Sequence, residues 1–293
     1  MRLLSRGSGD PILFIHGIPT SKKLWDGVVD RLFERFTCYT LDLPGLGEEP
    51  ATNHRLGELD RIVEEIERLR IERGCASWNV VGHDAGSAIA VLYAHRFAQR
   101  VRRLVLISPA LFPEIRPFYL FQFLRKPLVG ELMAPCIHPL IWRVAMRRAC
   151  QGENDTRAAL TAFESPFRGP LGPWRMMRLL RWGRPAEVLG EMPARLPQLQ
   201  MPTLIFHGAE DPAIPVSFAY RTAALIADAK LAIVKAGHFV PLNCPATVAE
   251  GLESFLTAER AAVEEPGTCS APLQPFFSAL SDSSTLGASP AAI

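Results

Sequence analysis

The sequence predicts an α/β protein with a doubly wound, mostly parallel sheet. Short apolar runs, of the length of buried strands, alternate with longer stretches that have helical periodicity. Polar residues follow directly after several of the apolar runs, and one long segment rich in proline and arginine, at 113–192, interrupts the alternation. Ligands of such sheets bind at the carboxyl ends of the strands, so we expect the functional side chains there.

The first part of the chain contains four expected strands and the helices that join them. The strands are the short apolar runs at 11–16, 37–43, 78–81 and 103–108. The connecting helices are expected at 23–36, 56–73 and 85–96. In the second of these helices the apolar residues recur on one face, and Gly74 follows as a helix stop. The opening residues 2–5 predict at most a reduced edge strand.

The alternation resumes after the interruption. Strands are expected at 203–207 and 231–234, a helix around 218–227, and a last core helix at 246–262. Residues 266–293 are rich in Pro, Ser, Ala and Gly and carry few charges, which predicts a disordered tail. The expected organisation is therefore a core of 1–112 and 193–265, an insertion at 113–192, and this tail.

Residues 80–86 have the form of a nucleophile elbow, with Asp84 at the position of the nucleophile. Gly82 and Gly86 leave room for a strained turn between a strand and a helix, and the free N–H groups at the helix start favour an ionised carboxylate. A carboxylate at this position can displace a leaving group from saturated carbon and form an alkyl-enzyme ester. The alternative interpretation is a plain turn with an Asx cap.

Polar residues at other strand ends give the elbow its context. His16-Gly17-Ile18-Pro19 closes one strand, Asp211 follows His207-Gly208, and Gly237-His238-Phe239 follows the last strand. With these motifs, and with Asp42-Leu43-Pro44-Gly45 after the second strand, the chain resembles the α/β-hydrolase superfamily over about its first nine-tenths. Its aspartate is similar to the nucleophiles of epoxide hydrolases and haloalkane dehalogenases.

The resemblance implies a role for each residue that matches the family pattern. Asp84 would form the ester, and His238, oriented by Asp211, would take a proton from the water that hydrolyses it. The backbone N–H groups of Ile18 and Ala85 would hold the oxyanion. From the residues alone, Asp211 also fits a helix cap and His238 a loop histidine, whereas His16 and His207 are expected to have structural roles.

The resemblance also implies that 113–192 is a helical cap that covers the site and excludes water. Tyr119 and His138 are its candidate proton donors for an opening epoxide ring. Dehalogenases typically carry halide donors at the positions that Ala85 and Ile18 occupy here, so we expect epoxide hydrolysis ahead of haloalkane dehalogenation. The cap arginines are interpreted as a solvated helix surface.

Two alternatives lie outside this chemistry. One is another α/β-hydrolase, with a serine nucleophile for which Ser87 and Ser108 are the nearest candidates. The other is an inactive scaffold that binds a ligand. The presence of both Asp211 and His238 argues against simple loss of activity.

Composition limits the partners. A net charge of +2 gives no reason to expect nucleic acid, and the six cysteines have no paired spacing that would indicate a metal site or a disulfide framework. We expect no cofactor, a small apolar electrophile and water as substrates, no membrane span, and a cytoplasmic location with reduced cysteines. The sequence does not indicate the oligomeric state.

Overall fold

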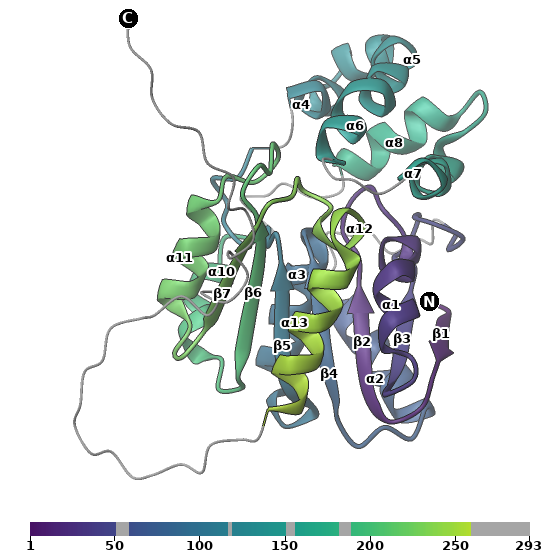
Figure 1. The fold of residues 1–293 in the computed structure, drawn as a ribbon. Coiled ribbons are helices and arrows are strands. Elements are labelled where there is room, and N and C mark those ends of the chain that lie inside the picture. The colour runs from purple at the N-terminus through teal and green to yellow at the C-terminus, as the bar shows by residue number, and fades with distance from the viewer. Residues whose placement is uncertain (51–58, 117–118, 151–155, 182–188, 259–293) are drawn as a thin grey trace, which may run out of the picture. The chain divides into compact units, whose positions relative to one another are not determined.

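The structure is a computed structural model that describes residues 1–50, 59–116, 119–150, 156–181 and 189–258 (Figure 1). The predicted tail at 266–293 lies outside these residues. Within them, no helix has both the length and the apolar character needed to cross a membrane.

The described residues form one seven-stranded sheet with the order β1-β3-β2-β4-β5-β6-β7. Only β1 runs antiparallel to its neighbour, and every other described pair is parallel. The predicted α/β fold with a mostly parallel sheet is therefore confirmed. The strands are β1 (Leu3–Arg6), β2 (Asp10–Ile15), β3 (Phe36–Leu41), β4 (Trp78–His83), β5 (Val101–Ile107), β6 (Thr203–Gly208) and β7 (Lys230–Val234).

Helices cover both faces of this sheet (Figure 1), which is why all six residues of β4 are buried and why the strand reads as a continuous apolar run. In the view of Figure 1, α1 and α13 lie in front of the sheet and α3 lies behind it. The flanking helices are α1 (Asp26–Leu32), α2 (Leu59–Glu72), α3 (Ala85–Arg96), α10 (Met192–Arg195), α11 (Ser217–Leu225), α12 (Val240–Asn243) and α13 (Pro245–Thr257).

Several helix boundaries differ from the sequence-based expectation: the last core helix, expected at 246–262, ends at Thr257, and the first helix differs most. The helix expected at 23–36 is a short 3-10 turn, Lys22–Trp25, followed by α1, which ends at Leu32. Phe36 instead begins β3, where it pairs with Asp10 and is buried. Helical periodicity did not reveal this boundary because the same apolar side chain fills the core from either conformation.

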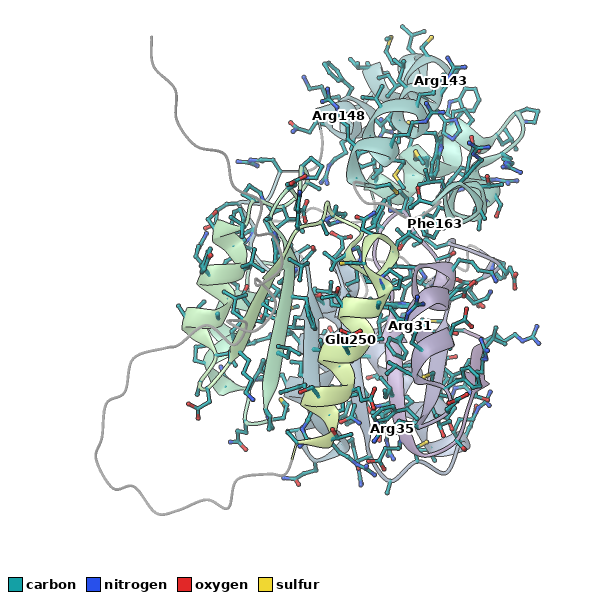
Figure 2. The ribbon with its side chains drawn as sticks, viewed as in Figure 1. Arg31, Arg35, Arg143, Arg148, Phe163 and Glu250 are labelled. Carbon is teal, nitrogen blue, oxygen red and sulfur yellow. The ribbon has the colours of Figure 1, made fainter. Side chains whose placement is uncertain are left out.

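The segment between β5 and β6 forms a group of helices at the carboxyl end of the sheet (Figure 1). Phe163 belongs to this group and lies on its side toward the sheet (Figure 2). Its ring centre is 6.0 Å from that of Phe239. The N–H of Phe239 also donates to the carbonyl of Ala149 at 3.2 Å. The helices are α4 (Tyr119–Arg125), α5 (Val129–Leu140), a π-helical turn (Ile141–Ala145), α6 (Met146–Ala149), α7 (Arg157–Glu164) and α8 (Gly172–Arg181).

The turn between β4 and α3 is packed so closely that it requires glycine. A Cβ atom on Gly86 would lie 2.4 Å from the carbonyl oxygen of Ile15 and 2.5 Å from that of His16. Both obstacles are backbone atoms of β2 and the loop after it, so they are unable to move aside as a flexible side chain would. The first turn of α3 is thereby held against the end of β2.

We predict that Gly86→Ala lowers the free energy of unfolding by about 1–3 kcal/mol, because the added methyl group overpacks a rigid contact. The measurement is urea unfolding followed by circular dichroism. Gly74→Ala is the matched control: Gly74 has a positive φ of 66° but nothing within 4 Å of the added atom. It should cost only the backbone strain, about 1–2 kcal/mol. Full stability of Gly86→Ala would contradict the close approach.

Candidate active site

Asp84 sits at the junction of β4 and α3 in a strained backbone conformation, with φ 50° and ψ −120°. Positive φ is uncommon for a residue with a side chain and marks sites where the surrounding structure holds the backbone in place. The N–H of Ile18 donates to Asp84 Oδ2 at 3.0 Å, and the N–H of Ala85 also bonds to this carboxylate. Oδ2 of Asp84 is thus held by the Ile18 donor.

Gly17 allows the loop after β2 to reach the Asp84 carboxylate. A Cβ atom on Gly17 would lie 2.5 Å from Asp84 Cβ and 2.6 Å from Asp84 Oδ2. Any other residue would therefore displace the loop that carries the Ile18 donor. This close approach explains why the motif His16-Gly17-Ile18-Pro19 has glycine at its second position.

Burial raises the pKa of Asp84 above its ordinary value. The positive charge available at His238 and the N–H groups of Ala85 and Ile18 act in the opposite direction, and the negative charge of Asp211 adds to the rise. The sequence analysis considered only the helix terminus, which favours the ionised form. The structure shows that removal of water from the carboxylate outweighs it.

Asp211 and His238 form a hydrogen-bonded pair, as the sequence analysis expected. His238 Nδ1 donates to Asp211 Oδ2 at 2.8 Å. Asp211 Oδ1 accepts from the N–H groups of Ala213 and Ile214 at 2.8 and 2.9 Å, so the carboxylate is fixed on both sides. Although burial alone would raise it, the charge of His238 and these hydrogen bonds lower the pKa of Asp211 to about 2.

His238 connects this pair to Asp84. Because Asp211 is an ionised acceptor, the proton on the ring of neutral His238 is assigned to Nδ1, and Nε2 is left facing Asp84 Oδ1 at 3.8 Å. Burial would lower the pKa of His238, but the Asp211 and Asp84 carboxylates outweigh burial and raise it above 6.5. The three side chains separated in the sequence therefore meet in one place.

His83 is a site residue that the sequence analysis missed. Its Nε2 donates to the backbone carbonyl of His238 at 3.0 Å, and the two rings lie 4.9 Å apart. Burial and the nearby His238 lower the pKa of His83 to about 3, so it remains neutral and does not repel His238. Its position directly before Asp84 could have indicated this role, because the last residue of β4 lies next to the loops at the end of the sheet.

His16 and His207 have the structural roles that were expected. His16 Nε2 accepts from the N–H of Leu43 at 2.9 Å, while its Nδ1 donates to the Gly17 carbonyl at 2.8 Å. His207 Nε2 donates to the Ile214 carbonyl at 2.9 Å. Both rings are fully buried. They fix the two loops that carry Ile18 and Asp211.

Asp84 and His238 open into a cavity of about 220 Å³. This volume is below the range of about 300–1,000 Å³ that is usual for pockets of drug-sized ligands, which indicates a small ligand. Apolar residues dominate the wall, and among the described residues that line it the only other charged ones are Arg116 and Arg125. The apolar lining residues include Ala88, Ile89, Ile115, Phe121, Met146, Leu179, Leu180, Leu189, Ile214 and Phe239.

The structure does not bring His138, one of the two candidate cap donors, to this cavity. His138 is buried in α5, its Nε2 accepts from Trp142 Nε1 at 3.1 Å, and it is not among the residues of the cavity wall. Tyr119, the other candidate, begins α4, but its side chain lies outside the described part of the structure.

The two serine alternatives are also placed away from the cavity wall. Ser87 is buried in the first turn of α3, where its Oγ donates to the Gly82 carbonyl at 2.9 Å. Ser108 is fully buried after β5. Neither hydroxyl faces the cavity, so these residues offer no nucleophile to a ligand bound there.

No group of three or more His, Cys, Asp or Glu side chains in the described ranges is arranged to hold a metal ion. The donor chemistry of the site agrees with this, since Asp211 and His238 satisfy each other and the N–H groups around them. The arrangement instead provides a buried carboxylate, a fixed imidazole and two backbone donors around an apolar cavity. These parts suit nucleophilic or general base chemistry.

Comparison with known proteins agrees with the fold. The family model described as "alpha/beta hydrolase fold" matches residues 10–134. Among solved structures, a haloalkane dehalogenase from Bradyrhizobium elkani superposes with a TM-score of 0.72 at 23% sequence identity, covering 88% of this chain and 95% of that one. At this identity the similarity shows the fold alone.

Sequence relatives have several different activities. An uncharacterised protein of Mycobacterium tuberculosis is 27% identical over 85% of this chain and 76% of its own length. A poly(3-hydroxyalkanoate) depolymerase of Ectopseudomonas oleovorans is 25% identical over 85% of both chains. A soluble epoxide hydrolase of Corynebacterium is 32% identical, over 37% of both chains. Together these comparisons show that the chain has the α/β-hydrolase fold, and that it is similar in sequence to proteins that include hydrolases.

Proposed function

We propose that the chain hydrolyses a small apolar electrophile through an alkyl ester on Asp84, and that the substrate is an epoxide. The observation that carries the proposal is the arrangement around one carboxylate. Asp84 has the backbone N–H of Ile18 on Oδ2, the imidazole of His238 at 3.8 Å from Oδ1, and an apolar cavity in front of it. An alkyl-enzyme ester needs each of these parts.

In the first step Asp84 Oδ1 attacks the electrophilic carbon. A carbon–oxygen bond forms, the bond to the ring oxygen of the epoxide breaks, and the electron pair moves to that oxygen, which takes up a proton from solvent and becomes a hydroxyl group. The backbone N–H groups of Ile18 and Ala85 keep Oδ2 in place and thereby aim Oδ1 at the cavity. The raised pKa of Asp84 reflects a poorly solvated carboxylate, which is a stronger nucleophile than a hydrated one.

In the second step water hydrolyses the ester. His238 Nε2 takes a proton from the water, whose oxygen attacks Cγ of Asp84, and the negative charge that develops on Oδ2 lies against the Ile18 and Ala85 donors. The ester carbon–oxygen bond then breaks, the departing oxygen of the diol takes the proton held by His238, and Asp84 releases the remaining proton of the water to solvent. This release restores the carboxylate and returns the proton that was taken up in the first step. Asp211 stabilises the imidazolium between these events.

We also propose that 113–192 acts as a cap over a core of 1–112 and 193–265. Residues of α4, α6 and α8 contribute Phe121, Met146 and Leu179 to the cavity wall, opposite Asp84 and His238. This apolar wall would limit the number of water molecules around Asp84 during the first step. Water would otherwise hydrate the carboxylate and compete with the substrate for it.

Haloalkane dehalogenation is the second candidate. It is favoured by the similarity of the fold to a haloalkane dehalogenase and by the cationic side chains of Arg116 and Arg125 in the cavity wall, either of which would stabilise a departing halide. The same two arginines would hydrogen-bond the oxygen of an opening epoxide but would not protonate it, because a guanidinium does not readily release its proton. A panel of epoxides and haloalkanes, with diol and halide measured together, separates the two reactions.

We predict that Asp84→Ala abolishes turnover of every substrate in that panel and leaves the far-ultraviolet circular dichroism spectrum unchanged. Removal of the carboxylate removes the nucleophile, while an alanine fits in the space of the aspartate. Ser87→Ala is the matched control and should keep the turnover within about tenfold of the unmodified chain. Activity that survives Asp84→Ala but is lost in Ser87→Ala would favour a serine hydrolase instead.

We predict that His238→Gln forms the alkyl ester but does not hydrolyse it. Glutamine has no basic nitrogen to deprotonate water, so the second step should slow by about 10²–10⁴-fold. Intact-protein mass spectrometry should then detect one added substrate mass. The double variant Asp84→Ala, His238→Gln should show no adduct. An unmodified His238→Gln with a confirmed substrate of the unmodified chain would count against the ester.

We predict that Asp211→Asn moves the acidic limb of the activity profile to lower pH. The second step requires neutral His238, whose pKa is raised above 6.5 chiefly by Asp211, so turnover should fall as pH decreases through that raised value. Without the Asp211 charge, burial dominates and the pKa of His238 falls. The maximal rate should also decrease, by on the order of a hundredfold or more. Glu210→Gln, an exposed neighbour, should leave the limb in place; an unmoved limb in Asp211→Asn would contradict the assignment.

A further inference from the structure

The large apolar side chains that the described structure exposes are concentrated on two helices. Six of its ten exposed large hydrophobic residues lie within 123–140, on α4, on α5 and in the turn between them. Leu128 is 83% exposed and Leu132 is 78% exposed. We call the set of Phe123, Leu128, Val129, Leu132, Met133 and Leu140 the α5 apolar face. Apolar residues scattered singly need no explanation, but a contiguous group indicates a binding surface.

The periodicity of α5 shows that this exposure is built into the helix. Gly130, Ala134, Ile137 and His138 are buried and form the inward face. The outward face consists of apolar residues apart from Glu131, whose carboxylate is paired with Arg181 at 3.0 Å. A surface helix normally presents charged residues to water, and one that is apolar on all sides requires a further apolar surface.

The backbone at Leu128 adds an independent observation. This leucine has a φ of 65°, a conformation that favours glycine or asparagine, and yet its side chain is the most exposed of the large hydrophobic group. The strain holds an apolar side chain out from the start of α5 instead of burying it. Strained residues of this kind mark positions where the conformation serves a binding role.

Basic side chains accompany the apolar face. Lys126 precedes α5, and Arg143, Arg147 and Arg148 follow it, and all four are exposed. None of the three arginines has an acidic partner among the residues that the structure describes. Figure 2 shows Arg143 at the end of this helical group that lies away from the sheet and Arg148 on the left side of the group. The segment 126–149 thus combines an outward apolar face with basic side chains, three of which have no acidic partner in the part of the chain that the structure describes.

We propose that the α5 apolar face docks on the surface of an anionic lipid bilayer. Apolar side chains that enter the boundary between head groups and acyl chains, with flanking Lys and Arg side chains on lipid phosphates, are the features of a peripheral membrane contact. No described helix is able to span a bilayer, so the contact is peripheral. A second copy of the chain is the weaker occupant, because a two-fold contact would bring two such basic groups together.

The docking face and the cavity share a helix. Phe121 and Arg125 of α4 line the cavity, and Phe123 of the same helix belongs to the apolar face. The docked chain would therefore hold one wall of its cavity next to the lipid, where small apolar molecules accumulate. The inference rests on surface exposure and charge, and it does not depend on the reaction assigned to Asp84.

The test is co-sedimentation of the full chain with vesicles of phosphatidylcholine alone and of phosphatidylcholine with phosphatidylserine. We expect binding to the anionic vesicles and at least tenfold weaker binding to the neutral ones. Leu132→Asp should weaken the anionic binding at least tenfold. The triple variant Arg143→Gln, Arg147→Gln, Arg148→Gln should weaken it by up to about a hundredfold, since each basic residue near such a surface contributes about fivefold.

Ile71→Ser is the matched control. Ile71 is also apolar and is 63% exposed, but it lies on α2, outside the helices between β5 and β6. It should bind as the unmodified chain does, and thermal unfolding should confirm that all variants are folded. Failure of the unmodified chain to bind either vesicle would overturn the proposal, as would equal losses in Ile71→Ser and Leu132→Asp. Light scattering provides the remaining outcome: a dimer that Leu132→Asp dissociates, without vesicle binding, would assign the face to self-association instead.

Discussion

The close approach of three backbone segments around Asp84 is the constraint on which the rest of the site depends. Gly86 allows α3 to begin against the end of β2, and Gly17 allows the next loop to reach the carboxylate. The resulting turn holds Asp84 at a positive φ and sets the Ile18 donor 3.0 Å from Oδ2. Larger residues at these glycines would separate the segments, and the aspartate would lose its donor while the sheet remained.

Charge and burial act against each other in this site, and the balance differs for each group. The side chain of Asp211 is fully buried, but two backbone donors and His238 keep its pKa at about 2. At Asp84 burial outweighs the N–H groups of Ile18 and Ala85, so its pKa rises. His238 lies between the two carboxylates, and their charges overcome its own burial. The site therefore contains one carboxylate that is firmly ionised and one that is poorly solvated, joined by a basic imidazole.

The helices between β5 and β6 have apolar residues on two sides for two different reasons. Residues such as Phe121 and Met146 face the cavity above Asp84, whereas Leu128 and Leu132 face outward. Only the first group follows from the need to cover a buried carboxylate. The second group has no partner in the described chain, and it is this difference that separates the proposed membrane contact from the proposed chemistry.

The sequence by itself determined the order and type of the core elements and the residues that meet at the sheet end. A buried parallel strand has a continuous apolar run, and a nucleophile elbow needs its two glycines. The sequence of 78–86 therefore sufficed to predict a strand that ends in such an elbow. The predicted helix boundary at 23–36 was wrong because Phe36 packs in the core from either conformation. Only the tertiary structure decided that His83 supports His238, that His138 bonds to Trp142 away from the cavity, and that Leu132 is exposed. The contact of His83 joins residues 155 positions apart, which no local pattern indicates. The other two facts depend on which side of α5 faces inward, and apolar residues on both sides of that helix leave this undecided in the sequence.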